Sequence, residues 1–318
     1  MLAVLLATFP FFALVLCGYA AVRYALLPQA AIPGLNSFVL YFALPCMLYR
    51  FGSTTPVAQF ADPALIGTYF ICAVVMVGAT IAASVRRVGW NDGAFGALVA
   101  SFPNTGYMGV PLLVALLGAA AAGPAIVTIL IDLLFTASAC IALSRFAGTG
   151  SQEAASAVRG ALRGVLVNPM PWAIVLGALA SAASLRLWPP IDGTVALLAD
   201  AASPVALFTI GAVLARSRAG TERTRGRSAR DEIPLALVKL VVHPALVYGV
   251  GRVAIALGAP LSPFVLTVLT LVAALPSASN AMVLAEWFGA DSGRIARIIL
   301  ATTTLAFLTF SGAVALLT

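Results

Sequence analysis

Two stretches of the sequence decide the fold of this chain: ASFPNTGYMGVPLLVALLG at residues 100–118 and AALPSASNAMVLAEWFG at residues 273–289. Each lies in a long apolar run, and each contains a proline, Pro103 or Pro276, that is followed by polar residues. Proline has no backbone N–H and its ring clashes with the preceding helical turn, so it kinks or ends a helix. We therefore predict two apolar helices that are interrupted at matching polar sites.

The composition places the chain in a membrane. Apolar residues make up 62% of the 318 residues and charged residues only 9%, whereas soluble domains carry about 25% charged residues. So few charges cannot cover the surface of a water-soluble fold. A helix needs about 20 largely apolar residues to cross a bilayer, and this chain is long enough for about ten such helices joined by short loops. The predicted fold class is an all-α integral membrane protein.

Ten apolar segments are predicted to cross the membrane, and the fourth and ninth are the interrupted ones. Glycine and proline inside these segments do not argue against them, because membrane helices tolerate both residues. The predicted spans are residues 2–22, 33–51, 64–85, 93–118, 123–145, 167–186, 191–215, 233–257, 262–289 and 293–316.

The basic residues support this number of spans and set an orientation. With ten spans, fourteen arginines fall in loops on one side of the membrane and three, Arg50, Arg186 and Arg252, on the other, while Lys239 lies within a span. Basic residues accumulate on the cytoplasmic side of a membrane protein. We therefore expect a multi-pass membrane protein whose arginine-rich loops face the cytoplasm and whose two termini lie outside it.

The two halves of the chain resemble each other. Pro45 in the second span corresponds to Pro204 in the seventh, and Pro103 in the fourth corresponds to Pro276 in the ninth. Because each half has five spans, the second half enters the membrane from the opposite side. Inverted repeats with matching interrupted helices are typical of secondary transporters.

We divide the chain into a first five-helix repeat at residues 1–146, a cytoplasmic linker at 147–166 and a second, inverted repeat at 167–318. The linker and the stretch RSRAGTERTRGRSARDE at residues 216–232 are the longest predicted loops. Because the arginines alternate with apolar spans, the net charge of +7 does not form the continuous basic face that nucleic-acid binding needs. The bilayer, and not nucleic acid, is the expected partner surface.

The two interruptions form the predicted substrate site. Unwound backbone at mid-membrane depth is tolerated only where protein or water satisfies it. Each break leaves a helix N-terminus, whose free N–H groups favour anions, and a C-terminus, whose carbonyls favour cations. The predicted substrate-binding residues are Pro103, Asn104, Thr105, Gly106, Pro276, Ser277 and Asn280.

Ionisable residues inside a membrane span are costly and commonly functional, and three of those in the predicted spans are candidates for a functional role. Asp132 lies in the fifth span, and Lys239 and His243 lie four residues apart on one face of the eighth. They are candidates for proton coupling or for balancing the charge of the substrate. The alternative for Asp132 and Lys239 is a structural ion pair, and the alternative for His243 is a hydrogen bond to backbone freed by Pro244.

Several motifs resemble those of the auxin efflux carrier family. SFPNTGYMGVPLLVALLG and LPSASNAMVLAEWFG are similar to its two crossover segments, while FVLYFALPCMLY and VNPMPWAIVLGAL resemble its second and sixth spans. The resemblance implies the ten-helix fold of the bile acid–sodium symporter superfamily, in which the broken fourth and ninth helices cross. It also implies a core of spans 3–5 and 8–10 that moves against a scaffold of spans 1, 2, 6 and 7, with Asn104 and Asn280 facing the substrate.

Residues and resemblance together predict a secondary transporter or facilitator for a small organic anion of the malate or malonate kind. The compact size resembles that of the family's bacterial members, which implies a protein of the bacterial inner membrane with both termini in the periplasm. We expect it to work by alternating access at the crossing of the two broken helices. Coupling to H⁺, to Na⁺ or to no ion stays open, and no cofactor or bound metal is expected. A homodimer through the scaffold helices is an open alternative to the monomer.

Two other classes of function fit the sequence less well. An intramembrane enzyme would need a catalytic constellation, but the sequence has one histidine and no HExxH or GxSxG motif. A membrane sensor or signalling module would normally carry a soluble output domain, which the predicted layout does not contain. We therefore predict no enzymatic activity and keep the sensor as the alternative function.

Overall fold

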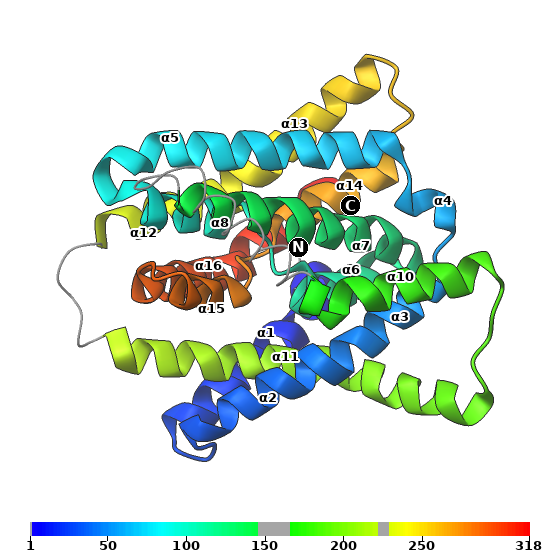
Figure 1. Cartoon of the computed structure of the whole chain (residues 1–318), viewed down its shortest axis with the longest axis horizontal. Coiled ribbons are helices and arrows are strands. Elements are labelled where there is room, and N and C mark those ends of the chain that lie inside the picture. Colours follow the sequence, from blue (N-terminus) through cyan, green and yellow to red (C-terminus); the bar gives the residue numbers. More distant parts are fainter. Residues whose placement is uncertain (1, 146–165, 222–228) are drawn as a thin grey trace. The chain divides into compact units, whose positions relative to one another are not determined.

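The structure is a computed structural model that describes residues 2–145, 166–221 and 229–318 (Figure 1). Throughout these residues the regular structure is helical, and they contain no β-strand. This agrees with the all-α class that the composition predicts. Apart from its last residue, the predicted linker at 147–166 lies outside the described residues.

The helices follow one another along the chain, and several are joined end to end by 3-10 or π-helical turns. Their bounds are α1 Leu2–Arg23, η1 Gln29–Ala31, α2 Ile32–Phe38, η2 Val39–Ala43, α3 Leu44–Thr54, α4 Val57–Phe60, α5 Pro63–Ser101, η3 Thr105–Gly109, α6 Val110–Leu117, η4 Ala119–Ala121, α7 Ala122–Ile131, η5 Asp132–Thr136, α8 Ala137–Ser144, α10 Pro169–Ala182, α11 Pro189–Thr221, α12 Ala229–Leu237, η6 Val238–Val242, α13 His243–Ala256, α14 Pro263–Ala274, α15 Asn280–Trp287 and α16 Ser292–Leu317.

The described part of the chain has six helical stretches that are long and apolar enough to cross a membrane. They are Gln29–Thr54, Ala58–Ser101, Ala119–Ser144, Pro189–Arg216, Glu232–Ala256 and Ser292–Leu317. Shorter apolar helices of 10–17 residues occur at Phe9–Arg23, Thr105–Leu117, Pro169–Ala182 and Pro263–Ala274. The chain is therefore a multi-pass membrane protein.

The element α5 consists of two helices, which are the third predicted span and the start of the fourth, joined by a sharp turn at Gly89 within the connection predicted at residues 86–92. Its backbone leaves the helical conformation at Gly89, where φ is 82°. Glycine adopts a positive φ at little cost because it has no Cβ, so the chain turns back there, and a Cβ added to Gly93 would lie 3.5 Å from Cα of Val85. Residues 90–101 then lead to the first interruption.

Three prolines follow closely on π-helical turns. The turn η2 ends two residues before Pro45, η3 two residues before Pro111, and η6 two residues before Pro244. A proline in a helix leaves a carbonyl of the preceding turn without its N–H partner, and a local π turn changes the hydrogen-bond register so that freed groups find partners. A fourth π turn, η5, begins at Asp132.

The described helices form two compact units. Unit 1 comprises Met1–Asp62, Thr105–Val127 and Asn168–Ala219, and unit 2 comprises Pro63–Asn104, Thr128–Val167 and Gly220–Thr318. The chain passes from unit 2 to unit 1 between Asn104 and Thr105, inside the first interruption.

Unit 1 contains two very close helix pairs with glycine at the contact. The helix α1 approaches α11 so closely that a Cβ on Gly211 would lie 1.9 Å from the carbonyl oxygen of Val15. The helix α3 lies beside α10 (Figure 1), and a Cβ on Gly177 would lie 2.5 Å from the carbonyl oxygen of Tyr49. These glycines let the helix backbones touch, which is a common packing mode in membranes.

Unit 2 has a core of small and apolar side chains along α5, α14 and α16. Its fully buried residues include Ala97 and Leu98 of α5, Leu269 and Val272 of α14, and Ile298 of α16. The helix α13 packs against α14 and α5, and α12 packs against α16. The second interruption lies wholly in this unit, and the first lies in it as far as Asn104.

We expect Gly211→Ala to destabilise the protein, because the new Cβ would meet the backbone of α1 and force the two helices apart. Overpacking of this kind costs about 1–3 kcal/mol. Gly193 lies in the same helix with no atom within 4 Å of an added Cβ, so Gly193→Ala should be neutral or stabilising by up to about 1 kcal/mol. Thermal unfolding in detergent compares the two variants, and equal melting temperatures would contradict the close contact.

Candidate functional site

The two interruptions meet inside unit 2 and pair through their backbones as an isolated antiparallel bridge. The N–H of Asn104 donates to the carbonyl of Pro276 at 2.8 Å, and the N–H of Ala278 donates to the carbonyl of Phe102 at 2.9 Å. Segments that are far apart in the sequence therefore touch at one point. We call this point the crossover, and it comprises residues 102–104 and 276–278.

Ser277 repairs a helical hydrogen bond that a proline removes at the crossover. Pro103 has no N–H to offer the carbonyl of Val99, and this carbonyl accepts the hydroxyl of Ser277 at 2.7 Å instead. The N–H of Ser277 donates to the hydroxyl of Thr302 in α16 at 3.3 Å. An unpaired backbone group is costly inside a membrane, so Ser277 helps to hold the two segments together.

Three helix ends converge on the crossover. The helices α5 and α14 end there with carbonyl groups, and α15 begins there with N–H groups. The side chain of Asn104 is 3% exposed, and its oxygen has no hydrogen-bond partner among the described residues. Asn280 is half-buried in the first turn of α15. Both asparagines that are predicted to face a substrate thus lie in or next to the crossover.

Thr105 and Gly106 are also predicted to bind substrate, and they belong to unit 1, where they begin the turn η3. The hydroxyl of Thr105 is buried and has no partner within the described residues. A Cβ on Gly106 would lie 3.2 Å from the terminal methyl group of Met170, so glycine leaves room for that side chain. Pro111 then lies in the first turn of α6, where proline is well tolerated.

The predicted charged residues lie together in unit 2. The carboxylate of Asp132 accepts the hydroxyl of Tyr69 at 2.9 Å and the hydroxyl of Thr136 at 3.0 Å. Asp132 also interacts electrostatically with Lys239, and neither of these two residues is exposed. A buried charge needs such partners, because burial without them costs several kcal/mol. We call Tyr69, Asp132, Thr136, Lys239 and His243 the charge cluster.

Lys239 connects the charge cluster to the crossover. Its Nζ donates to the carbonyl of Ala273 at 2.6 Å and lies 3.2 Å from Nδ1 of His243. In an uninterrupted helix the carbonyl of Ala273 would accept the N–H of Ser277, but that N–H is bonded to Thr302. Lys239 therefore supplies the donor that the break after α14 removes, and its charge suits a helix C-terminus.

Two members of the charge cluster are missing from the sequence prediction. Thr136 lies one helical turn after Asp132, so its spacing could have indicated the contact. Tyr69 belongs to α5, and nothing in its local sequence distinguishes it. Its ring lies 6.3 Å from that of His243. Within the described residues the polar contact of His243 is with Lys239, and not with backbone freed by Pro244.

A second set of contacts ties α5 to the turn between α15 and α16. Nδ2 of Asn91 donates to the carbonyls of Phe288 and Gly289 at 3.2 and 3.0 Å, and the carboxylate of Asp92 accepts the N–H of Asp291 at 2.8 Å. These contacts bring the kinked start of the fourth predicted span and the end of the ninth to the same end of unit 2. The predicted layout assigns both segments to the cytoplasmic side.

Residues 3–314 match the model of a protein family described as membrane transport proteins. The chain belongs to this family. It is also 30% identical over 308 residues to a protein of Rhizobium meliloti (strain 1021) described as "Putative malonate transporter", with 95% of this chain and 92% of that protein covered. These findings confirm the resemblance to the auxin efflux carrier family and the prediction that the protein is a membrane transporter.

We expect Ser277→Ala to lower the free energy of unfolding by about 1–3 kcal/mol, because it leaves the buried carbonyl of Val99 without a donor. Thr304→Ala is the matched control. The Thr304 hydroxyl is exposed and bonds to its own helix at 2.8 Å, so its loss should cost no more than about 0.5 kcal/mol. Denaturant unfolding in detergent measures both variants. A Ser277→Ala protein as stable as Thr304→Ala would argue against the bond across the crossover.

A double-mutant cycle tests the interaction between Asp132 and Lys239. Each of Asp132→Asn and Lys239→Met removes one buried charge and leaves the other uncompensated, which costs about 3–5 kcal/mol. The double variant should lose less stability than the sum of the single losses, with a coupling of about 0.5–3 kcal/mol. The exposed ion pair of Arg50 and Asp200, at 3.2 Å, is the control, and its coupling should stay below about 1 kcal/mol. Additive losses for the buried pair would show that the two charges act separately.

Proposed function

We propose that the protein is a carrier that moves a small organic anion across the bacterial inner membrane by alternating access at the crossover. It acts as a secondary active transporter or as a facilitator. The observation that carries this proposal is the backbone pairing of two interrupted segments in a member of a transport family. Non-helical backbone at membrane depth is tolerated where it lines a substrate pathway, and matching broken helices hold the substrate in many secondary transporters.

The chemistry of the crossover suits a carboxylate. The N-terminus of α15 offers N–H groups that carry a partial positive charge. Asn104 adds a buried side-chain amide with an oxygen that lacks a partner among the described residues, and an amide can both donate to a carboxylate and accept from a carboxylic acid. The printed description of the Rhizobium relative supports a malonate-like dicarboxylate as the substrate class.

We further propose ten membrane helices arranged as two inverted five-helix repeats, with both termini in the periplasm. The close glycine contacts in unit 1 support this arrangement. They join α1 to α11 and α3 to α10, which are the first predicted span with the seventh and the second with the sixth. If the repeats are related by symmetry, the first span corresponds to the sixth and the second to the seventh. A contact between the first and seventh spans then implies an equivalent contact between the sixth and second. The distribution of arginines supports the orientation.

We assign unit 1 to the scaffold and unit 2 to the moving core. Unit 1 contains the first, second, sixth and seventh predicted spans, and unit 2 contains the third, eighth, ninth and tenth, while the fourth and fifth are divided between them. We propose that unit 2 moves relative to unit 1. Movement of one helix bundle against another is common in secondary transporters that have repeats with interrupted helices. A homodimer, if one forms, would use scaffold helices.

The charge cluster is the proposed element of coupling or charge balance. Lys239 interacts electrostatically with Asp132 and also donates to the carbonyl of Ala273 beside the crossover. A change in its charge or in that of Asp132 would therefore alter the end of α14 where the substrate is proposed to bind. This supports a link between the ionisation of the cluster and transport, with H⁺ the simplest coupling ion.

Uptake of radiolabelled malonate into liposomes that contain the purified protein tests the proposal. We expect saturable uptake, and we expect Asn104→Ala combined with Asn280→Ala to lower kcat/KM by at least about tenfold, because each lost hydrogen bond to a charged group contributes about 1.5–3 kcal/mol. Asn36→Ala, in α2 and outside both interruptions, is the control and should transport like the wild type. Unchanged uptake by the double variant would reject the crossover as the substrate site.

A further inference from the structure

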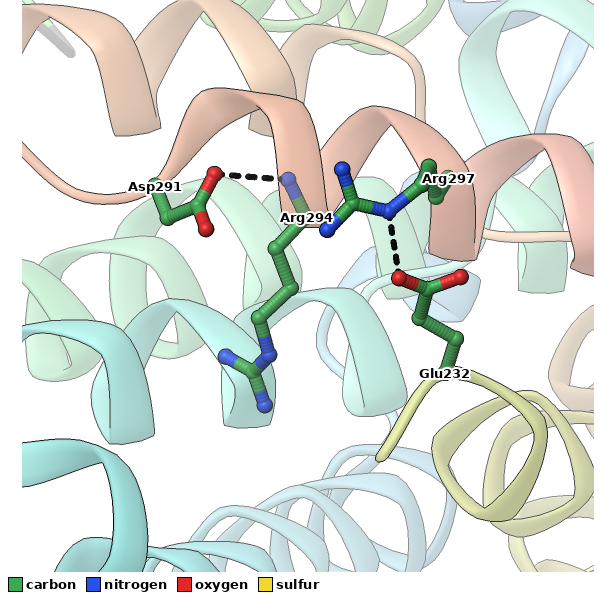
Figure 2. A network of polar contacts seen from close by, with 4 residues as sticks. All are labelled: Glu232, Asp291, Arg294 and Arg297. Atoms are coloured by element: carbon green, nitrogen blue, oxygen red, sulfur yellow. Dashed lines mark hydrogen bonds and ion pairs between the residues drawn. The ribbon is translucent and has the colours of Figure 1, made fainter. Parts of the chain in front are cut away.

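Two arginines that lie one helical turn apart at the start of α16 differ in their partners. Arg297 pairs with the carboxylate of Glu232, and both side chains are largely buried. Arg294 is only 1% exposed, yet within the described residues its guanidinium is not in ion-pair contact with any carboxylate. Figure 2 shows the Arg294 side chain running away from Glu232, while Arg297 is joined to Glu232 through its Nε.

The position of the Arg294 guanidinium is fixed from two sides. Its Nη1 donates to the backbone carbonyl of Asp92 in α5 at 2.9 Å. It also lies directly against Gly96, where an added Cβ would be 3.2 Å from Nη2 and 3.3 Å from Nη1. Its backbone is held as well, because the carboxylate of Asp291 accepts the Arg294 N–H at 2.8 Å (Figure 2). A guanidinium held in this way is preorganised.

One edge of this guanidinium carries unused donors. Nε and Nη2 are both buried, and neither has a hydrogen-bond partner within the described residues. These neighbouring nitrogens form the edge with which arginine binds the two oxygens of a carboxylate in a bidentate pair. A buried charge whose donors stay unpaired is strongly unfavourable, so the arrangement is complete only when an acceptor occupies this edge.

We propose that the Nε–Nη2 edge of Arg294 binds the carboxylate of the transported anion at a station separate from the crossover. This inference rests on the proposed function. Gly96 precedes Pro103 by seven residues of almost entirely helical chain, which places the station about 10 Å from the crossover along α5 at about 1.5 Å per residue. A three-carbon dicarboxylate is too short to reach both places, so the anion occupies them in turn.

The contacts of Asn91 and Asp92 with the turn before α16 place the station near the end of unit 2 that the predicted layout assigns to the cytoplasm. An anion that moves between the crossover and the cytoplasm would meet Arg294 on this side. The station would therefore govern the affinity for substrate at the cytoplasmic face more than the affinity at the periplasmic face.

The test uses the full chain and three variants. Arg294→Lys keeps the charge but loses the paired donors, Gly96→Ala keeps the arginine but displaces its guanidinium, and Arg297→Lys is the matched control. Malonate binding is measured by thermal shift on purified protein, with neutral malonamide as the control ligand. We expect Arg294→Lys to weaken malonate binding by roughly 10- to 100-fold, the loss of charge-assisted hydrogen bonds. Gly96→Ala should weaken it by less, because the added Cβ moves the guanidinium by only a few tenths of an ångström, and Arg297→Lys should bind malonate like the wild type.

Transport kinetics show on which face of the membrane Arg294 affects the apparent affinity for malonate. In inside-out membrane vesicles, where the cytoplasmic face meets the added malonate, Arg294→Lys should raise KM by a similar factor. In right-side-out vesicles its KM should change by less than about threefold, because the periplasmic route reaches the crossover first. An equal rise in KM on both faces would overturn the assignment of a separate cytoplasmic station.

The outcomes separate this inference from the proposed function. If malonate stabilises the wild type and both Arg294→Lys and Gly96→Ala bind it equally well, the edge is satisfied by water or by the protein itself, and the station is rejected while the carrier proposal stands. If none of malonate, malate and succinate stabilises the wild-type protein or is taken up by vesicles that contain it, the substrate class is rejected and the station with it. A loss of binding in Arg297→Lys as large as in Arg294→Lys would show a general effect of charge at this end and would also reject the station.

Discussion

The backbone hydrogen bonds lost where the helices are interrupted, after α5 and after α14, are the constraint on which the rest of unit 2 depends. In a membrane no water is at hand to replace them, so each unpaired group needs a partner from the protein. The Ser277 hydroxyl supplies one for Val99, and Lys239 supplies one for Ala273. The two broken segments complete the arrangement by bonding to each other. The polar groups of the candidate site are therefore part of its structure.

This constraint also explains why charged residues lie so deep in the protein. A lysine that donates to a helix C-terminus must be buried beside it, and a buried ammonium group needs a carboxylate nearby. Asp132 provides that charge, and Tyr69 and Thr136 hold its oxygens in place. The structural and functional alternatives for these residues are thus compatible. The lysine that stabilises the break after α14 also interacts with Asp132, so a change in the charge of either residue would affect the end of α14.

Arg294 shows where local sequence rules fail. Its position between two predicted spans makes it one of many cytoplasmic arginines, whose usual role is to orient the chain. The structure instead buries it against Gly96, where Nη1 donates to Asp92 and the other two guanidinium nitrogens have no partner within the described part of the chain. Nothing in its local sequence sets it apart from Arg297, because the difference between them is made by α5 and α12, which are distant in sequence. The turn at Gly89, in contrast, separates the third and fourth predicted spans where the sequence places a loop.

The sequence by itself determined the membrane environment, the two interruptions and the polar residues that follow them, because hydropathy and proline geometry are properties of short segments. It also carried the motifs that place the chain in its family. Only the tertiary structure decided that Pro103 and Ser277 meet, that Lys239 bonds to Ala273, and that Tyr69 and Arg294 are buried polar residues with defined contacts. These facts depend on which helices lie side by side, and a hydrogen bond between distant segments leaves no pattern in either segment alone.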